Sequence, residues 1–257
     1  MTEQSYEFTG LEKVNIHGYT VRQIRATRDI PRHGIRKGDL GGWIESSELT
    51  NGDARVSGNA WVYGNAQVYG NAQVSGNAQV SGNAQVSGNA WVYSDAWVSG
   101  NAQVYGNAQV SGNARVYSDA WVSGNAQVYG NARVYGNARV SGNAQVSGNA
   151  WVSGNAWVSG NAQVSGNARV EKTWHYIAVD PIGSEGVVAT VFRTENGKHI
   201  LAVGCWTGTL GTLMAEVKRR RESWRADELT QDLWMEQYRA LKRLGNATIA
   251  RWAEVSK

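Results

Sequence analysis

A six-residue phrase, Val-(Ser/Tyr)-Gly-Asn-Ala-(Gln/Trp/Arg), is repeated with few departures twenty times between Thr50 and Arg169. Ala fills the fifth position of every copy, and Thr50 is the one first-position residue that is not Val. An unbroken short period of this kind predicts a solenoid, in which each repeat packs on its neighbours along the chain. Residues 44–49 count as a degenerate first copy, so 44–169 would make seven coils of eighteen residues.

The order of residues within the phrase predicts short strands joined by corners. Alternate side chains of a strand point to opposite faces, so Ala and Val would point inward and their neighbours outward. Gly and Asn tolerate a positive φ better than other residues and would form the corner. Three strands and three corners would close a triangular coil around a Val and Ala core too narrow for a ligand. The corner Asn residues would stack into hydrogen-bonded ladders.

This pattern resembles the left-handed parallel β-helix of the hexapeptide-repeat superfamily, and that resemblance alone implies the hand of the coil. The leader Gly38-Asp39-Leu40-Gly41-Gly42-Trp43-Ile44-Glu45 resembles one in hexapeptide-repeat proteins of bacteriophages and prophages. The stretch Gly204–Leu210, with Val217 and Tyr238 further on, is similar to a small α+β module at the C-terminus of phage proteins. The resemblance implies a phage or prophage setting.

Stacking the chain at intervals of eighteen residues sorts the sixth-position side chains into three faces. The first face is mostly Gln: Arg55, Gln73, Trp91, Gln109, Gln127, Gln145 and Gln163. The second face is Trp61, Gln79, Trp97, Arg115, Arg133, Trp151 and Arg169. The third face is Gln67, Gln85, Gln103, Trp121, Arg139 and Trp157. A neighbouring outward column carries Tyr at seven second positions, Tyr117 and Tyr135 among them.

The second and third faces concentrate Trp and Arg, and exposed aromatic clusters are typical of partner surfaces. Hexapeptide β-helices commonly pack side by side as trimers, so the resemblance implies a homotrimer. The expected interface residues are Trp61, Trp97, Arg115, Trp121, Arg133, Arg139, Trp151 and Trp157. Binding of a ligand other than a second copy, or simple exposure, are the alternatives.

The composition changes on both sides of the solenoid, which predicts an N-terminal β cap over 1–43, the β-helix over 44–170, and a C-terminal α+β module over 171–257. Tyr19–Ala26 has the alternation of a strand. In the module, strands are predicted over 175–179, 186–193 and 199–204, with a hairpin turn at Asn196-Gly197. Helices are predicted over 210–225 and 229–244.

The module also contains the residues that we select as candidate ligand-binding groups: Cys205, Thr207, Thr209, Arg219, Arg220 and Tyr238. A Gly- and Thr-rich stretch before a helix can bind an anion through backbone amides at the helix N-terminus. The lone Cys205 is expected to be structural rather than nucleophilic. The run Lys218–Arg221 is more typical of a solvated helix face than of a nucleic-acid site.

Charge and cysteine content restrict the setting. The net charge is +4, and the solenoid contributes none of it, because 44–170 holds five acidic and five basic residues. That excess is too weak to indicate nucleic acid, and no stretch has the length and apolarity of a membrane span, so we expect neither nucleic acid nor membrane as a partner. A single cysteine excludes an internal disulfide and fits a reducing compartment. The expected location is the cytoplasm, which for a phage protein is that of the host.

Catalysis is not expected. Acyltransferases of the hexapeptide-repeat superfamily need a general-base His beside the coils, and its carbonic anhydrases need three zinc-binding His residues. Here His17, His33, His175 and His199 all lie outside the repeats. We expect no metal and no cofactor. The favoured function is non-catalytic binding or sequestration of a host factor or small anionic ligand such as a nucleotide, with antagonism of host defence as the role. The alternatives are a structural fibre or self-assembling scaffold, and an acyltransferase-like enzyme.

Overall fold

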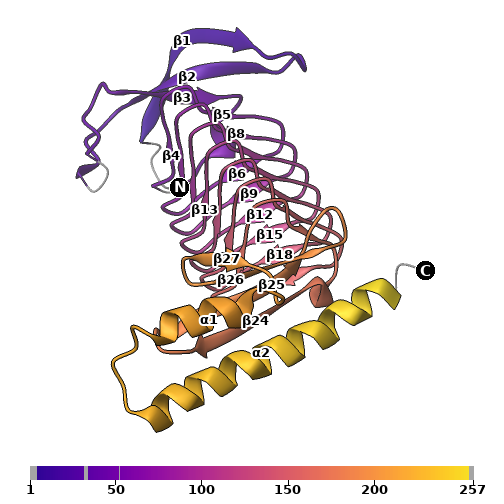
Figure 1. Ribbon diagram of the computed structural model, residues 1–257. Coiled ribbons are helices and arrows are strands. Elements are labelled where there is room, and N and C mark those ends of the chain that lie inside the picture. Colours follow the sequence, from indigo (N-terminus) through magenta and orange to yellow (C-terminus); the bar gives the residue numbers. More distant parts are fainter. Residues whose placement is uncertain (1–4, 32–33, 52, 255–257) are drawn as a thin grey trace.

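The computed structural model describes residues 5–31, 34–51 and 53–254, and it shows a mainly β protein (Figure 1). A parallel β-solenoid of about seven turns forms the body, as predicted. A region of antiparallel strands covers its N-terminal end, and a small sheet with two helices covers its C-terminal end.

Two-residue strands stack into the three predicted faces. The first face holds β4 (Arg55–Val56), β7 (Gln73–Val74), β10 (Trp91–Val92), β13 (Gln109–Val110), β16 (Gln127–Val128), β19 (Gln145–Val146) and β22 (Gln163–Val164). The second face holds β5 (Trp61–Val62), β8 (Gln79–Val80), β11 (Trp97–Val98), β14 (Arg115–Val116), β17 (Arg133–Val134), β20 (Trp151–Val152) and β23 (Arg169–Val170). The third face holds β6 (Gln67–Val68), β9 (Gln85–Val86), β12 (Gln103–Val104), β15 (Trp121–Val122), β18 (Arg139–Val140) and β21 (Trp157–Val158).

Each strand pairs in parallel with the strand eighteen residues away. Trp97 is in register with Arg115, for example, and Arg115 with Arg133. The backbone ladder runs along the rod, as where the Trp61 amide donates to the Ala78 carbonyl at 2.9 Å. Every coil therefore presents the same three side-chain columns as the coil before it.

The interior is the predicted ladder of Val and Ala. Val110 and Ala114 are typical members, and neither exposes any surface. Identical small aliphatic layers repeat at the strand spacing of ~4.8 Å, so the inside of the rod is narrow and closely packed.

At each corner one residue adopts the positive φ and another forms the side-chain ladder. Glycine takes the positive φ at nearly every corner, while Ser94 and Ser118 do so at φ 61° in the two copies that lack Gly. The Asn residue does not adopt a positive φ among the described corners, contrary to our expectation. Its side chain instead makes the predicted ladder, as where Asn83 Nδ2 donates to Asn101 Oδ1 at 3.0 Å.

The N-terminal strands extend the second face and cover the first coil. β1 (Tyr6–Val14) pairs antiparallel with β2 (Thr20–Ala26), and β2 pairs with β3 (Leu40–Ile44), which joins β5 in parallel. Ile24 packs on the end of the Val and Ala core. A Cβ atom on Gly42 would lie 2.7 Å from the Ala60 carbonyl oxygen, so the leader needs glycine there to approach the first coil. The predicted strand over Tyr19–Ala26 is confirmed, whereas β1 was not predicted.

A short 3-10 helix, η2 (Ser47–Leu49), leads into the coils, and a second, η3 (Thr173–His175), leaves them. The module that follows has one antiparallel sheet of β24 (Tyr176–Ile182), β25 (Val187–Arg193), β26 (His199–Val203) and β27 (Trp206–Gly208). Its three predicted strands and the turn at Asn196-Gly197 are confirmed, and β27 is a fourth strand. Phe192 is fully buried and belongs to the rod core, so this sheet closes the C-terminal end of the solenoid.

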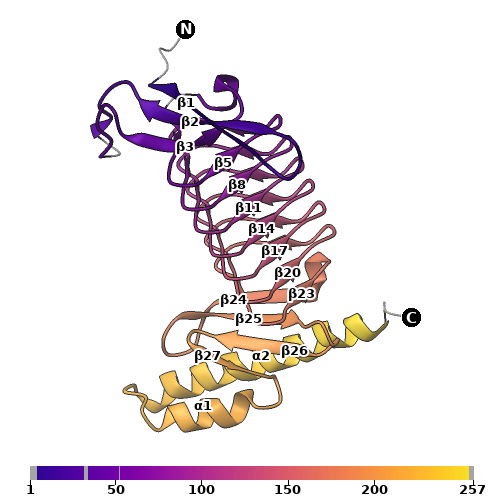
Figure 2. The ribbon, with the colours of Figure 1, turned by 90° about the horizontal axis from the view of Figure 1, so that it is seen from above.

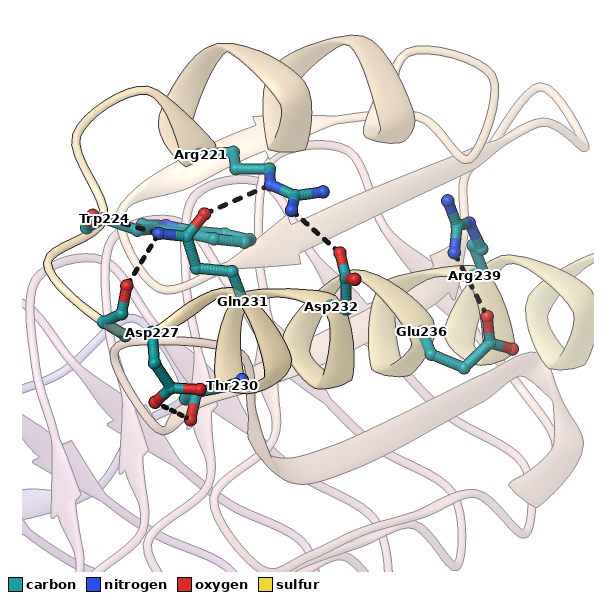
Figure 3. Close-up of polar contacts among 9 residues, drawn as sticks. Arg221, Trp224, Asp227, Thr230, Gln231, Asp232, Glu236 and Arg239 are labelled. Carbon is teal, nitrogen blue, oxygen red and sulfur yellow. Dashed lines mark hydrogen bonds and ion pairs between the residues drawn. The ribbon is translucent and has the colours of Figure 1, made fainter.

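The two helices pack on the side of this sheet that faces away from the rod (Figure 2). α1 spans Leu213–Arg221 and α2 spans Glu228–Glu254. Polar contacts fix the turn between them (Figure 3). Arg221 donates to Gln231 at 3.2 Å and to Asp232 at 2.8 Å, and Gln231 donates to the Ala226 carbonyl at 2.9 Å.

Candidate functional site

The second face carries a strip of aromatic and basic side chains in its middle coils. Trp97, Arg115, Arg133 and Trp151 follow one another on β11, β14, β17 and β20, and Tyr117 and Tyr135 stand in the adjacent column. These six residues are called the strip below. Inward Val and Ala side chains lock each strand, so the strip lies on a rigid scaffold.

Arg115 and Arg133 are direct neighbours in the parallel register. Like charges directly opposite on adjacent strands destabilise a sheet. Within the described part of the chain, no carboxylate forms an ion pair with either guanidinium. Arg169, two strands beyond Arg133, differs because it bonds Glu195 at 2.7 Å. The centre of the strip is therefore a fixed, uncompensated pair of positive charges.

Each arginine of the strip also lies against an indole. The Arg115 guanidinium carbon is 5.6 Å from the Trp97 ring centroid, and that of Arg133 is 4.8 Å from Trp151. Arg169 approaches the Trp151 ring to 3.6 Å. Contacts of this type orient the guanidinium groups without neutralising their charge.

Tyr117 and Tyr135 form a parallel ring stack. Their centroids are 4.9 Å apart and their planes differ by 2°. Trp151 meets Tyr135 edge to face, with centroids 6.1 Å apart. Burial raises the pKa of Tyr117, and the neighbouring Tyr135 raises it further, while Arg133 and Arg115 act in the opposite direction.

A hollow of about 150 Å³ lies beside this stack, lined by Trp97, Ser99, Arg115, Tyr117 and Arg133. Ser99 occupies the position that Tyr117 and Tyr135 hold on the next two coils. In the same column Ser81 is only 6% exposed, because the Trp97 indole leans over it and donates to its hydroxyl at 3.3 Å. Ser99 has no such indole above it and stays partly open.

The third face has a smaller aromatic and basic group. Arg139 lies 4.7 Å from the Trp121 ring, and Trp121 meets Tyr105 edge to face. Trp157 is 51% exposed, although its indole nitrogen donates to Ser141 at 3.0 Å.

Other tryptophans depart from the simple picture of two Trp-rich faces. Trp61 packs against the buried cluster of Val21, Trp43 and Tyr63, so it contacts the N-terminal strands of its own chain. On the first face, which is otherwise mostly Gln, Trp91 is 46% exposed.

The six candidate residues of the C-terminal module do not converge on one pocket. Thr207, Thr209 and Arg219 line a shallow surface hollow together with Glu216. Cys205 is exposed. Tyr238 is buried, and its ring packs on Gly183 in the module core.

A carboxylate in that hollow already pairs with the two candidate arginines. Arg219 and Arg220 both bond Glu216, at 2.7 and 2.8 Å, and these bonds lower the pKa of Glu216 to about 2. In the turn before α1 the Leu210 amide donates to His199 Nε2 at 3.1 Å, and at the start of α1 the Leu213 amide donates to the Thr209 carbonyl at 3.0 Å. Hydrogen bonds within the chain therefore engage the amide of the first α1 residue, Leu213, and the amide of Leu210 in the turn before it.

Two of the described histidines accept backbone hydrogen bonds within the fold. His175 accepts a hydrogen bond from the Glu171 amide at 3.3 Å, and His199 accepts that from Leu210. His17 is exposed in the turn between β1 and β2, and His33 lies outside the described residues. Across 5–31, 34–51 and 53–254, no group of three His, Cys, Asp or Glu side chains is arranged to hold a metal ion. In the same part of the chain, no helix combines the length and apolarity needed to cross a bilayer.

Comparison with known proteins supports the architecture. A family model described as YdcK beta solenoid repeat matches nine stretches of the chain: 66–82, 72–88, 78–92, 84–100, 108–124, 126–142, 132–147, 144–160 and 162–172. The repeat region is thus similar to β-solenoid repeats of that description. A comparison with curated proteins found no match.

Proposed function

We propose that the protein is a non-catalytic binding protein whose solenoid presents the strip to an anionic partner. The observation that carries this proposal is the register of Arg115 and Arg133, which places two arginines on adjacent strands, and among the described residues no carboxylate forms an ion pair with either. An anion bridging them would relieve their repulsion and accept charge-assisted hydrogen bonds. The flanking Trp97 and Trp151 add apolar contact surface.

The covered ends of the rod favour a discrete particle over a fibre. Ile24 packs on the first coil and Phe192 on the last, so neither end of the Val and Ala core is open to a second rod. Open strand edges are what end-to-end growth of a solenoid requires. A fibre or scaffold therefore has less support than a binding particle.

We further propose that copies associate as a homotrimer through the Trp-bearing third face, which leaves the strip of the second face open to the ligand. Support comes from Trp157, which is half exposed on the third face beside Arg139, with Trp121 on the next strand. Large exposed aromatic side chains are typical of subunit and partner contacts. Trp61 is excluded from the proposed contact because it packs within its own chain.

The proposal includes the place where the protein acts. The leader Gly38–Glu45 resembles that of phage and prophage proteins, which supports an accessory protein acting in the host cytoplasm. Sequestering an anionic ligand on a rigid face is a chemistry suited to antagonism of host defence. His175 and His199 serve as hydrogen-bond acceptors in the fold, which supports a role without catalysis.

Native mass spectrometry of protein purified from cells of its natural host tests both parts. The expected result is a trimer mass with a small anionic adduct, and the adduct should disappear in the double variant Arg115→Gln, Arg133→Gln. Arg139→Gln removes one positive charge from the third face, as either single variant does from the strip, and should keep the adduct. A monomer without any adduct would contradict the proposal.

A further inference from the structure

The tyrosine stack of the strip ends abruptly at Ser99. Tyr135 covers one face of the Tyr117 ring, with centroids 4.9 Å apart and planes parallel to within 2°. That separation matches the strand spacing of ~4.8 Å, so the stack runs along the rod with one ring per coil. The other face of Tyr117 is therefore turned toward the coil of Ser99, where the column has no ring.

The space over Ser99 is open, whereas equivalent serines are closed. Ser81 and Ser153 stand in the same column and are 6% and 4% exposed, respectively. Over Ser99 lies instead the hollow of about 150 Å³, with Tyr117 and Trp97 among its lining residues. This volume and the exposed face of Tyr117 suit a single planar ring.

Positive charge borders the same space. Arg115 and Arg133 both line the hollow, and neither is held by a carboxylate among the described residues. Arg115 is an exposed residue, so its guanidinium is accessible from solvent. A ring that stacked on Tyr117 would therefore have an anion subsite beside it.

We propose that the hollow over Ser99 binds a planar aromatic ring that carries an anionic group, with the ring stacked on Tyr117 and the anion held by Arg115 and Arg133. A nucleotide has this chemistry, in which the base supplies the ring and the phosphate the anion. Stacking on an aromatic side chain accepts any base, so the site would select for a ring with an anion and only weakly among bases. The inference rests on the proposed binding role of the strip and specifies its ligand class.

Three probes separate the two requirements: adenosine 5′-monophosphate, adenosine without the phosphate, and ribose 5-phosphate without the ring. Titration calorimetry on the full chain should show the strongest binding for adenosine 5′-monophosphate. The double variant Arg115→Gln, Arg133→Gln should weaken that binding by about tenfold or more, which is the usual effect of removing charge-assisted hydrogen bonds.

Ser99→Tyr is the sharper variant, because it would place a third ring in the stack and fill the hollow. The fold accepts Tyr at this position of the repeat, as Tyr117 and Tyr135 show. Ser99→Tyr should abolish binding of adenosine 5′-monophosphate. Ser111→Tyr makes the same change on the first face and should leave the affinity unaltered.

Sedimentation of the same samples keeps this inference separate from the proposed function. Equal binding of adenosine 5′-monophosphate and ribose 5-phosphate would overturn the ring subsite while leaving an anion-binding strip. A trimer that binds none of the three probes would overturn the ring and anion subsite and leave self-association standing. Undiminished binding by Ser99→Tyr would overturn the assignment of the ring to this hollow.

Discussion

Ser118 stands directly beyond Gly100 at one corner of the solenoid, and a Cβ atom on Gly100 would lie 2.8 Å from the Ser118 amide nitrogen. Successive corners are thus packed backbone on backbone. Ser118 itself keeps φ at 61°, a conformation that favours glycine. The regularity of the rod imposes this backbone on the corners from Gly58 to Gly166, including the two where the residue is serine.

Exchanging Ser and Gly at corners should change stability in opposite directions. Ser118→Gly removes a left-handed penalty of roughly 1–2 kcal/mol, offset by about 0.4–1 kcal/mol of added chain entropy, so a small stabilisation is expected. Gly112→Ser should destabilise, because its φ is 64° and its Cβ would lie 3.0 Å from the Gly130 amide nitrogen. Denaturant midpoints of the two variants would measure this. A shift of both in the same direction would contradict the account of the corner.

A charged side chain placed in the rod interior should destabilise the fold. Val110 is fully buried between identical layers, and Val110→Asp would leave an unpaired carboxylate there. We expect a loss of several kcal/mol in the free energy of unfolding. Gln109→Asp changes the adjacent outward residue and should cost far less. Similar melting temperatures for the two variants would refute the assignment of inward and outward positions.

The two phenylalanines of the chain should differ sharply in their contribution to stability. Phe192 is fully buried where the C-terminal sheet closes the rod, while Phe8 is 36% exposed on β1. Phe192→Ala should cost about 3–5 kcal/mol, the usual range for a buried Phe. Phe8→Ala should cost under about 1 kcal/mol. Urea unfolding of both variants measures the difference. Equal losses in the free energy of unfolding would show that Phe192 does not stabilise the end of the last coil.

Mild acid should weaken the C-terminal end of the molecule. Burial lowers the pKa of His175, with Arg193 adding to the effect, and burial lowers the pKa of His199. A histidine with a lowered pKa binds fewer protons folded than unfolded, so its contribution is present above the unfolded pKa of 6.5 and is lost as the pH falls below it. The melting temperature should therefore be lower at about pH 5.5 than at about pH 7.5.

A variant pair identifies the source of this pH dependence. His199→Gln keeps an acceptor for the Leu210 amide but does not titrate, so the difference in melting temperature between the two pH values should shrink. His17→Gln, at an exposed turn, should leave that difference unchanged. A full-size pH effect in a variant with both His175→Gln and His199→Gln would assign the effect to other groups.

The period of six was sufficient to predict the three faces, their side-chain columns and the Val and Ala core. Those features depend only on alternation along a strand and on stacking at eighteen residues. The hollow over Ser99 depends on something else: the indole of Trp97 leans back over Ser81 on the preceding coil. The direction in which the Trp97 side chain points depends on its rotamer and on the size of the neighbouring side chains. The repeat pattern of the sequence does not specify either.

The boundaries of the two helices were also predicted only in part. We expected a helix from Leu210, but Thr209 and Thr212 bond each other in a turn and α1 begins at Leu213. We expected the second helix to end at Leu244, before Gly245, yet α2 continues to Glu254. A Cβ on Gly245 would lie 2.6 Å from Leu210 Cδ1, so this glycine permits close packing instead of ending the helix.

Because eighteen residues make one coil, the number of residues between two positions of the solenoid sets the angle between them about the rod axis. Removing one whole coil would shorten the rod by ~4.8 Å and leave the strip facing the same way relative to α2. Removing a single six-residue phrase would instead turn everything on one side of the cut by a third of a turn. Inserting or deleting six-residue phrases outside the strip would thus change the direction in which the strip faces in steps of a third of a turn. None of the strip residues would need to be changed.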